Sequence, residues 1–169
     1  MELLIVRHAI ACDRDPRRWP DDAERPLSPP GVTRARRAAA GLKRLAPRPA
    51  RVLTSPLVRT RETAAILTQF AAWPKATSCP LLLPGASPEA LLGLLARSGN
   101  RCIAVVGHEP DLSRLLATCL SGDAAHTAFE FRKMGVALIA FPGKPSAGEA
   151  ELLWFVPPRL LRAARRTPQ

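Results

Sequence analysis

The feature that most constrains this chain is a short apolar run, residues 3–6, that stops abruptly at Arg7 and His8. The run is too short to require a helix and too apolar for an exposed edge, so it predicts a central strand of a sheet that is covered on both faces. Open α/β sheets bind ligands beyond the carboxyl ends of their strands. Arg7 and His8 are therefore expected at a binding crevice, where arginine suits oxyanions and histidine titrates near neutrality.

Two further strands are predicted to end in the same way. Residues 101–106 form a nearly continuous apolar run that is followed by His108. Residues 51–54 form a short strand that leads through Ser55 into a helix, for which Ser55 is the expected N-cap. Arg59 then lies in the first turn of this helix, where unpaired backbone N–H groups already favour an anion.

The rest of the chain alternates predicted helices with predicted strands. Helices are expected over residues 29–45, from about 57 to 72, from 87 to about 99, from 111 to about 120 and from 158 onward, and further extended segments over 77–83, 135–141 and 151–156. This alternation predicts an α/β fold with three layers, in which helices cover both faces of a mostly parallel central sheet.

Length and composition point to one domain spanning residues 1–169, because 169 residues with 47% hydrophobic content can bury a single core of ordinary size. No apolar run approaches the roughly 20 residues that span a bilayer, and no secretory signal pattern is present. We therefore expect a cytoplasmic protein with no membrane partner. The cysteines are widely spaced and include no C-x-x-C pair, which disfavours disulfides and a zinc site.

The net charge of +11 raises the alternative of a non-catalytic module that binds anions or nucleic acid. Aromatic residues make up only 5% of the chain and tyrosine is absent, so no stacking platform accompanies the charge, and nucleic acid is not the expected partner. The tail carries a basic cluster that is typical of a solvated helix end. Its members are Arg159, Arg162, Arg165 and Arg166.

A long polar loop, residues 10–27, leaves directly from the predicted site. Loops of this length without regular structure are usually functional, so we expect a lid or a wall of the site. Its carboxylates Asp13, Asp15 and Glu24 are candidate proton donors, as is Glu109 beside His108. For Glu109 the competing interpretation is a carboxylate at a helix start, stabilised by the helix dipole.

Taken together, two arginines and two histidines around a helix N-terminus would suit a phosphoryl dianion. At these residues the sequence resembles the histidine phosphatase superfamily, and more closely its small SixA-type phosphohistidine phosphatases. The resemblance rests on stretches that occur in the expected order over most of the chain. They are residues 6–9 (Val-Arg-His-Ala), 25–31, 52–63 and 105–110.

The resemblance implies a phosphoglycerate mutase-like fold and a phosphatase that uses no metal or other cofactor. It also implies that His8 accepts the phosphoryl group, that Arg7, Arg59 and His108 hold the phosphate, and that Ser55 helps to shape the pocket. Neutral His8 would attack phosphorus through one ring nitrogen while the other donates to a backbone carbonyl. The expected protein is a monomer that acts on a phosphohistidine domain; a small phosphorylated molecule is the alternative substrate.

Two departures from the wider superfamily bear on the substrate. Ala9 stands where many relatives have glycine after the Arg-His pair. Residues 81–84 read Leu-Leu-Leu-Pro where mutase-like members carry a glutamate that serves as general acid. A phosphate monoester needs its leaving alkoxide protonated, whereas phosphohistidine leaves readily as imidazole, so the missing glutamate favours phosphohistidine.

Overall fold

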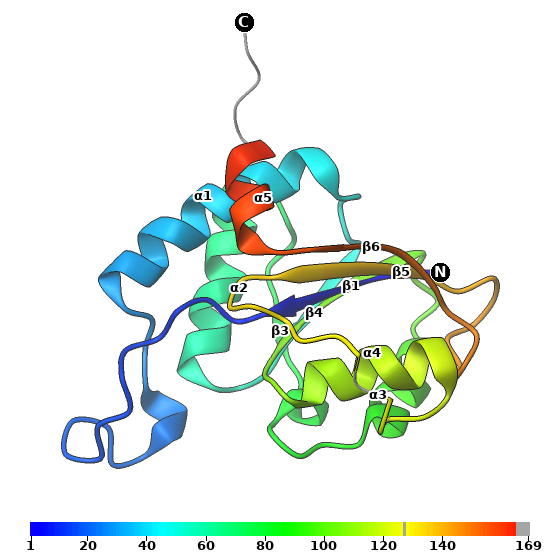
Figure 1. Cartoon of the computed structure of the whole chain (residues 1–169), viewed down its shortest axis with the longest axis horizontal. Helices are drawn as coiled ribbons and strands as arrows, with labels where there is room; N and C mark the ends of the chain where they lie inside the picture. The colour runs from blue at the N-terminus through cyan, green and yellow to red at the C-terminus, as the bar shows by residue number, and fades with distance from the viewer. Residues whose placement is uncertain (127, 165–169) are drawn as a thin grey trace, which may run out of the picture.

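A six-stranded sheet forms the middle layer of the protein in this computed structural model, which describes residues 1–126 and 128–164 (Figure 1). The strands lie in the order β3-β2-β4-β1-β5-β6. Their bounds are β1 Glu2–Arg7, β2 Arg51–Thr54, β3 Thr77–Ser78, β4 Cys102–Gly107, β5 Val136–Ala140 and β6 Glu151–Val156. Strands β1 to β4 run parallel to one another, and β5 pairs antiparallel with both β1 and β6.

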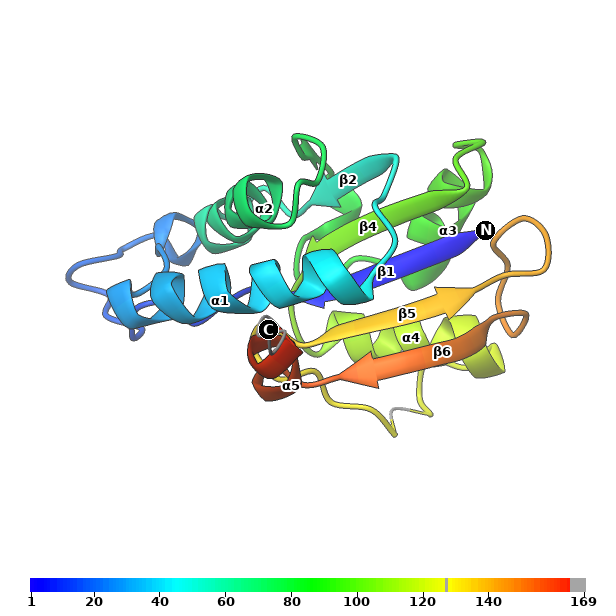
Figure 2. The same ribbon diagram turned by 90° about the horizontal axis from the view of Figure 1, so that it is seen from above.

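Helices cover both faces of this sheet, as the alternation of elements predicted. In Figure 1, α1 (Pro29–Leu45) and α5 (Pro158–Ala164) lie above the sheet, and α3 (Pro88–Ala96) and α4 (Asp111–Ser121) lie below it. Helix α2 (Val58–Phe70) packs in the same core cluster as α1. Figure 2 shows the same two layers from above. The three-layer α/β prediction is therefore confirmed. Arg165 and Arg166, part of the predicted basic helix end, lie outside the described residues.

Strand β1 lies at the centre of the core because its side chains alternate between the two helical layers. Leu4 and Val6 pack in the cluster that includes α1 and α2, whereas Leu3 and Ile5 pack in the cluster that includes α3 and α4. All four side chains are fully buried. Successive side chains of a strand point to opposite faces of the sheet. A strand that is covered on both faces therefore needs an uninterrupted apolar run.

Strand register brings three chain segments to one edge of the sheet. Arg7 of β1 lies opposite Gly107 of β4, and Thr54 of β2 lies opposite Val106. The residues that immediately follow these strands therefore emerge side by side, which the rule for parallel sheets predicted.

The predicted capping role of Ser55 is wrong. Helix α2 begins at Val58 with Leu57 at the N-cap, and no side-chain hydrogen bond caps it. The backbone N–H of Ser55 instead donates to the carbonyl of Val106 at 3.0 Å, so Ser55 continues the β2 pairing and is fully buried. Its hydroxyl is thereby free to face the neighbouring strand end.

A glycine fixes the start of α1 against the chain that follows His8. A Cβ atom at Gly31 would lie 2.0 Å from the carbonyl oxygen of Ile10, so no side chain fits between them. The capping hydroxyl of Ser28 accepts from the Gly31 N–H at 3.2 Å. This close approach holds the first residues after His8 in place. Among the described residues no helix is both long and apolar enough to cross a membrane.

Candidate active site

His8 is buried at the carboxyl end of β1, with 7% of its surface exposed. Its Nδ1 lies 2.6 Å from the carbonyl oxygen of Ala9, and because a carbonyl can only accept, Nδ1 donates. Burial lowers the pKa of His8 to about 3; the bond to Ala9 opposes this shift, and the charges of His108, Arg59 and Lys133 reinforce it. At neutral pH the ring is therefore uncharged, and Nε2 keeps its lone pair.

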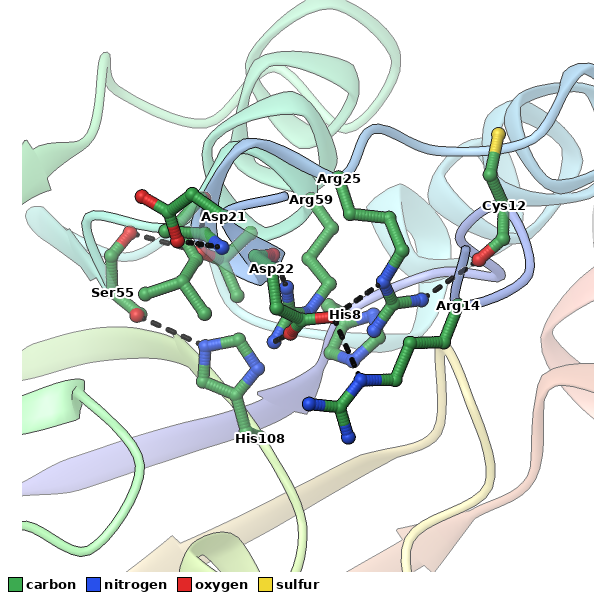
Figure 3. Close-up of polar contacts among 12 residues, drawn as sticks. His8, Cys12, Arg14, Asp21, Asp22, Arg25, Ser55, Arg59 and His108 are labelled. Atoms are coloured by element: carbon green, nitrogen blue, oxygen red, sulfur yellow. Dashed lines mark hydrogen bonds and ion pairs between the residues drawn. The ribbon is translucent and has the colours of Figure 1, made fainter. Parts of the chain in front are cut away.

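His108 follows β4 and lies next to His8, with 5.2 Å between the ring centroids (Figure 3). Its Nε2 forms a 2.9 Å hydrogen bond with the hydroxyl of Ser55. Burial lowers its pKa to about 4, and nearby Arg59 adds to the shift. The other ring nitrogen, Nδ1, is buried and has no hydrogen-bond partner among the described residues.

The two predicted arginines reach the same place from different elements. Arg7 donates through Nη1 to the carbonyl of Phe131. Arg59, in the first turn of α2, is 5% exposed and donates through Nη1 to the carbonyl of Asp22 at 2.8 Å. The Nε atoms of both arginines are buried and, within the described part of the chain, have no partner. Buried polar groups are normally satisfied, so these N–H groups are available to donate to the acceptor oxygens of a ligand.

Asp22 is the site residue that sequence reasoning missed. It lies in a short 3₁₀ helix, η1 (Asp22–Glu24), inside the long polar loop. Its carboxylate lies 3.1 Å from Arg59 Nη2, 2.8 Å from Arg25 Nε and 4.0 Å from Arg14 Nε (Figure 3). The hydrogen bond from Arg25 is the main cause that lowers the pKa of Asp22, with the arginine charges assisting. An anionic group thus already faces Arg59.

Among the described residues, none of the three candidate proton donors of this loop forms an ion pair with the arginines of that cluster. The carboxylate of Asp15 accepts from the backbone N–H of Arg17 at 2.9 Å. Asp13 and Glu24 are exposed. The loop therefore forms a wall of the site through Asp22 and Arg25, rather than through the three carboxylates that the sequence singled out.

Glu109 takes the structural role that competed with catalysis. Its carboxylate accepts from the hydroxyl of Ser113 at 2.9 Å, from the Ser113 N–H at 3.3 Å and from the Phe131 N–H at 2.7 Å. It caps the start of α4 and fixes the segment whose carbonyl accepts from Arg7. Glu109 thus supports the site indirectly, by positioning Arg7.

The segment after Phe131 contributes a second feature that the sequence did not reveal. The backbone N–H of Met134 lies 3.1 Å from the carbonyl of Arg7 and 3.2 Å from that of His8, and so fixes the end of β1. The preceding residue, Lys133, adds positive charge that lowers the pKa of His8. Neither feature has a local sequence signal, because the segment lies more than a hundred residues from His8.

Comparison with known proteins identifies the family. Residues 3–78 match the family model of the histidine phosphatase superfamily (branch 1). The structure of the protein histidine phosphatase SixA complexed with tungstate is similar over 95% of this chain and 99% of that chain, with a TM-score of 0.82 and 25% sequence identity. The chain belongs to the histidine phosphatase superfamily. The family prediction made from residues 6–9 and the later stretches is confirmed.

Two other proteins are similar to this chain, one in sequence and one in fold. An uncharacterised protein of Picosynechococcus sp. is 34% identical over 139 residues, which cover 80% of this chain and 82% of that protein. The alpha-ribazole phosphatase of Shigella flexneri has the same fold, with a TM-score of 0.70 and 17% identity over 92% of this chain and 96% of that chain. Phosphatases with different substrates thus share this fold. Among the described residues, no cluster of three or more His, Cys, Asp or Glu is arranged to hold a metal ion.

The two buried histidines of this superfamily member make its stability depend on pH. The pKa values of His8 and His108 lie near 3 and 4 in the folded state, against an ordinary 6.5. Between these lowered values and pH 6.5, the folded state therefore binds fewer protons than the unfolded chain. Their contribution to the free energy of unfolding is complete above pH 6.5 and falls as the pH drops toward 4, with a limiting slope of about 1.4 kcal/mol per pH unit for each proton.

Urea unfolding between pH 7 and pH 4 measures this dependence. A variant with both His8→Asn and His108→Asn should lose a large part of the slope that the wild type shows. Equal slopes in the two proteins would contradict a buried, uncharged histidine pair.

Proposed function

We propose that the protein is a metal-independent phosphohistidine phosphatase, which removes phosphate from a histidine of another protein through a covalent intermediate on His8. One observation carries the proposal. The uncharged ring of His8 lies 5.2 Å from that of His108, and three buried nitrogen atoms of the predicted site residues, Nε of Arg7, Nε of Arg59 and Nδ1 of His108, have no partner among the described residues. A phosphoryl group bonded to His8 would supply the oxygens that these nitrogens lack.

The proposed reaction proceeds in two displacements. Nε2 of His8 attacks phosphorus in line, a P–N bond to His8 forms, and the P–N bond of the substrate breaks as its imidazole leaves with a proton. Water then attacks the phosphorylated His8, which releases inorganic phosphate and restores the neutral ring. The transition state spreads charge over the equatorial oxygens, so Arg7, Arg59 and His108 would act through position and electrostatics.

The surroundings of the pocket favour a leaving group that needs little acid assistance. The apolar segment at residues 81–84 includes the buried Leu82 and offers no carboxylate. The carboxylate of Glu109 is held by Ser113 and Phe131. The pKa of Asp22 is lowered by Arg25 and Arg59, so Asp22 stays ionised and is a poor acid. A phosphoramidate fits these conditions better than a phosphate monoester.

A small phosphorylated metabolite is the alternative substrate. The fold that this chain shares with an alpha-ribazole phosphatase supports this alternative. The test compares kcat/KM for a phosphohistidine-bearing carrier domain with kcat/KM for a panel of phosphate monoesters. We expect a preference of at least about 100-fold for the carrier domain, a difference of roughly 3 kcal/mol in transition-state binding. A preference for any monoester would overturn the assignment of substrate.

Replacing Asp22 with asparagine should strengthen the binding of phosphate analogues. The Asp22 carboxylate lies 3.1 Å from Arg59, so it competes with an incoming oxyanion for the same guanidinium. Removing its charge should lower the Kd for tungstate by about 5- to 30-fold, the equivalent of 1–2 kcal/mol. Isothermal titration calorimetry of the wild type and Asp22→Asn measures the difference.

Glu24→Gln is the matched control, since it removes the same charge from the same 3₁₀ helix at an exposed residue. It should leave tungstate binding unchanged. Weaker tungstate binding by Asp22→Asn would mean that Asp22 positions Arg59 rather than competing for it.

A further inference from the structure

A second cavity begins where the chain leaves His8. Its volume is about 360 Å³, and it lies between α1, α5 and the segment that follows Phe131. Ala9 and Ile10, the two residues after His8, form part of its wall. We call this cavity the basic groove, because four cationic side chains line it. They are Arg34, Arg132, Lys133 and Arg162.

The charge of the groove is of one sign. No carboxylate lines it, and none of the four cations forms an ion pair with a carboxylate in the described residues. The cavity formed by the long loop, which also contains Ile10, is different because Asp13 and Asp15 line it together with Arg18. The charge of Asp13 acts on Lys133 but Asp13 does not line the groove, so the lining itself would attract an anion.

The groove is connected to the site by the backbone. The N–H of Met134, one of the lining residues, lies within 3.2 Å of the carbonyls of Arg7 and His8. Lys133 lowers the pKa of His8 through its charge, which places this cation within electrostatic reach of the nucleophile. A ligand in the groove would therefore lie next to whatever carries the phosphoryl group at His8.

We propose that the basic groove binds a carboxylate-rich segment of the phosphoprotein substrate beside the phosphohistidine that His8 attacks. This inference rests on the proposed function and names the chemistry of the partner surface. The cations come from three separate parts of the chain, and Arg34, Arg132 and Lys133 are exposed. Exposed charges that are spread over an open cavity suit several carboxylates on a protein surface better than one small anion, which needs convergent buried donors.

The test uses the double variant Arg34→Glu/Arg162→Glu, which reverses two charges of the groove without touching the pocket of His8. We expect KM for a phosphohistidine carrier domain to rise about 10-fold or more with little change in kcat, because charges at an interface mainly change encounter and affinity. Hydrolysis of a small phosphoramidate should be unchanged. The salt dependence of kcat/KM for the carrier domain should also decrease.

The matched control is Arg97→Glu/Arg101→Glu, which makes the same charge change at exposed residues near the amino end of β4. It should leave KM for the carrier domain unchanged. An equal rise in KM in both variants would reduce the effect to net charge and overturn the proposal, as would an unchanged KM in the groove variant.

Other outcomes separate the groove from the proposed function. Loss of small-phosphoramidate hydrolysis in a folded groove variant would make the groove part of the catalytic pocket and overturn docking. A groove variant that loses oligonucleotide binding but keeps the carrier-domain KM would assign the groove to nucleic acid. A wild-type protein that hydrolyses neither the phosphohistidine carrier domain nor the small phosphoramidate would refute the proposed function itself. If the reversal prevents folding, Arg34→Gln/Arg162→Gln replaces it, with an expected rise in KM of about 3-fold.

Discussion

His8→Ala is expected to abolish phosphohistidine hydrolysis, lowering kcat by about 10⁵-fold or more. The proposed mechanism depends on Nε2 of an uncharged His8. The hydrogen bond from Nδ1 of His8 to the carbonyl of Ala9 holds the ring in place. Without this nucleophile the arginines should still bind phosphate, but no covalent intermediate could form. The measurement is quenched-flow turnover of a radiolabelled phosphohistidine carrier domain, with the protein assayed for acid-labile, base-stable phosphate.

His126→Ala serves as the control, because the side chain of His126 is 74% exposed and pairs only with nearby Asp123 in the described structure. It should retain wild-type turnover and labelling. Circular dichroism should show both variants folded. Turnover by His8→Ala at a rate close to the wild type, or a wild-type enzyme that never carries phosphate on His8 during turnover, would contradict the mechanism.

The convergence of the four site residues was predictable because parallel strands share a direction. The apolar run at residues 3–6 fixes a covered strand, and the run that precedes His108 fixes another. Once both belong to one parallel sheet, their following residues must emerge at the same edge. The observed pairing of Arg7 with Gly107 follows this rule, because it aligns the ends of β1 and β4. The fold and the clustering of these residues could therefore be predicted from the sequence.

The parts that could not be predicted depend on loop conformation. Ser55 has the residue type and spacing of an N-cap, yet the β2–β4 pairing extends through it and delivers its hydroxyl to His108. Asp22 stands in a loop with several other carboxylates. Only the folded position of η1 against α2 brings it, rather than Asp13 or Glu24, to Arg59. No local pattern distinguishes these residues before the loop is placed.

Asp22 also explains how a cluster of positive charge persists in a folded protein. Burial and the nearby Arg25 both lower the pKa of Arg59, which shows the cost of placing this cation in the pocket, and Asp22 offsets part of that cost. In the proposed mechanism a phosphoryl group would replace the carboxylate, because it brings more charge and more acceptor oxygens. Under this proposal, both the affinity for phosphate and the stability of the ligand-free protein would depend on Arg59.

Arg59→Lys is therefore expected to lower kcat/KM for a phosphohistidine carrier domain by about 10²- to 10³-fold, or roughly 3–4 kcal/mol. Lysine keeps the charge but loses the planar fork, and with it the Nε donor that is buried and unpartnered here. Arg59→Ala should lose about 10-fold more, because the charge is also removed. Steady-state kinetics together with tungstate titration measure both losses.

Arg61→Lys and Arg61→Ala provide matched controls on the same helix. Arg61 lies two residues further along α2 but is exposed, and it should tolerate both changes. Comparable losses at Arg59 and Arg61 would indicate a general effect of charge on substrate encounter. A loss confined to Arg59, and present in the lysine variant as well as the alanine variant, requires a directional contact with the phosphoryl oxygens, because a point charge alone would be restored by lysine.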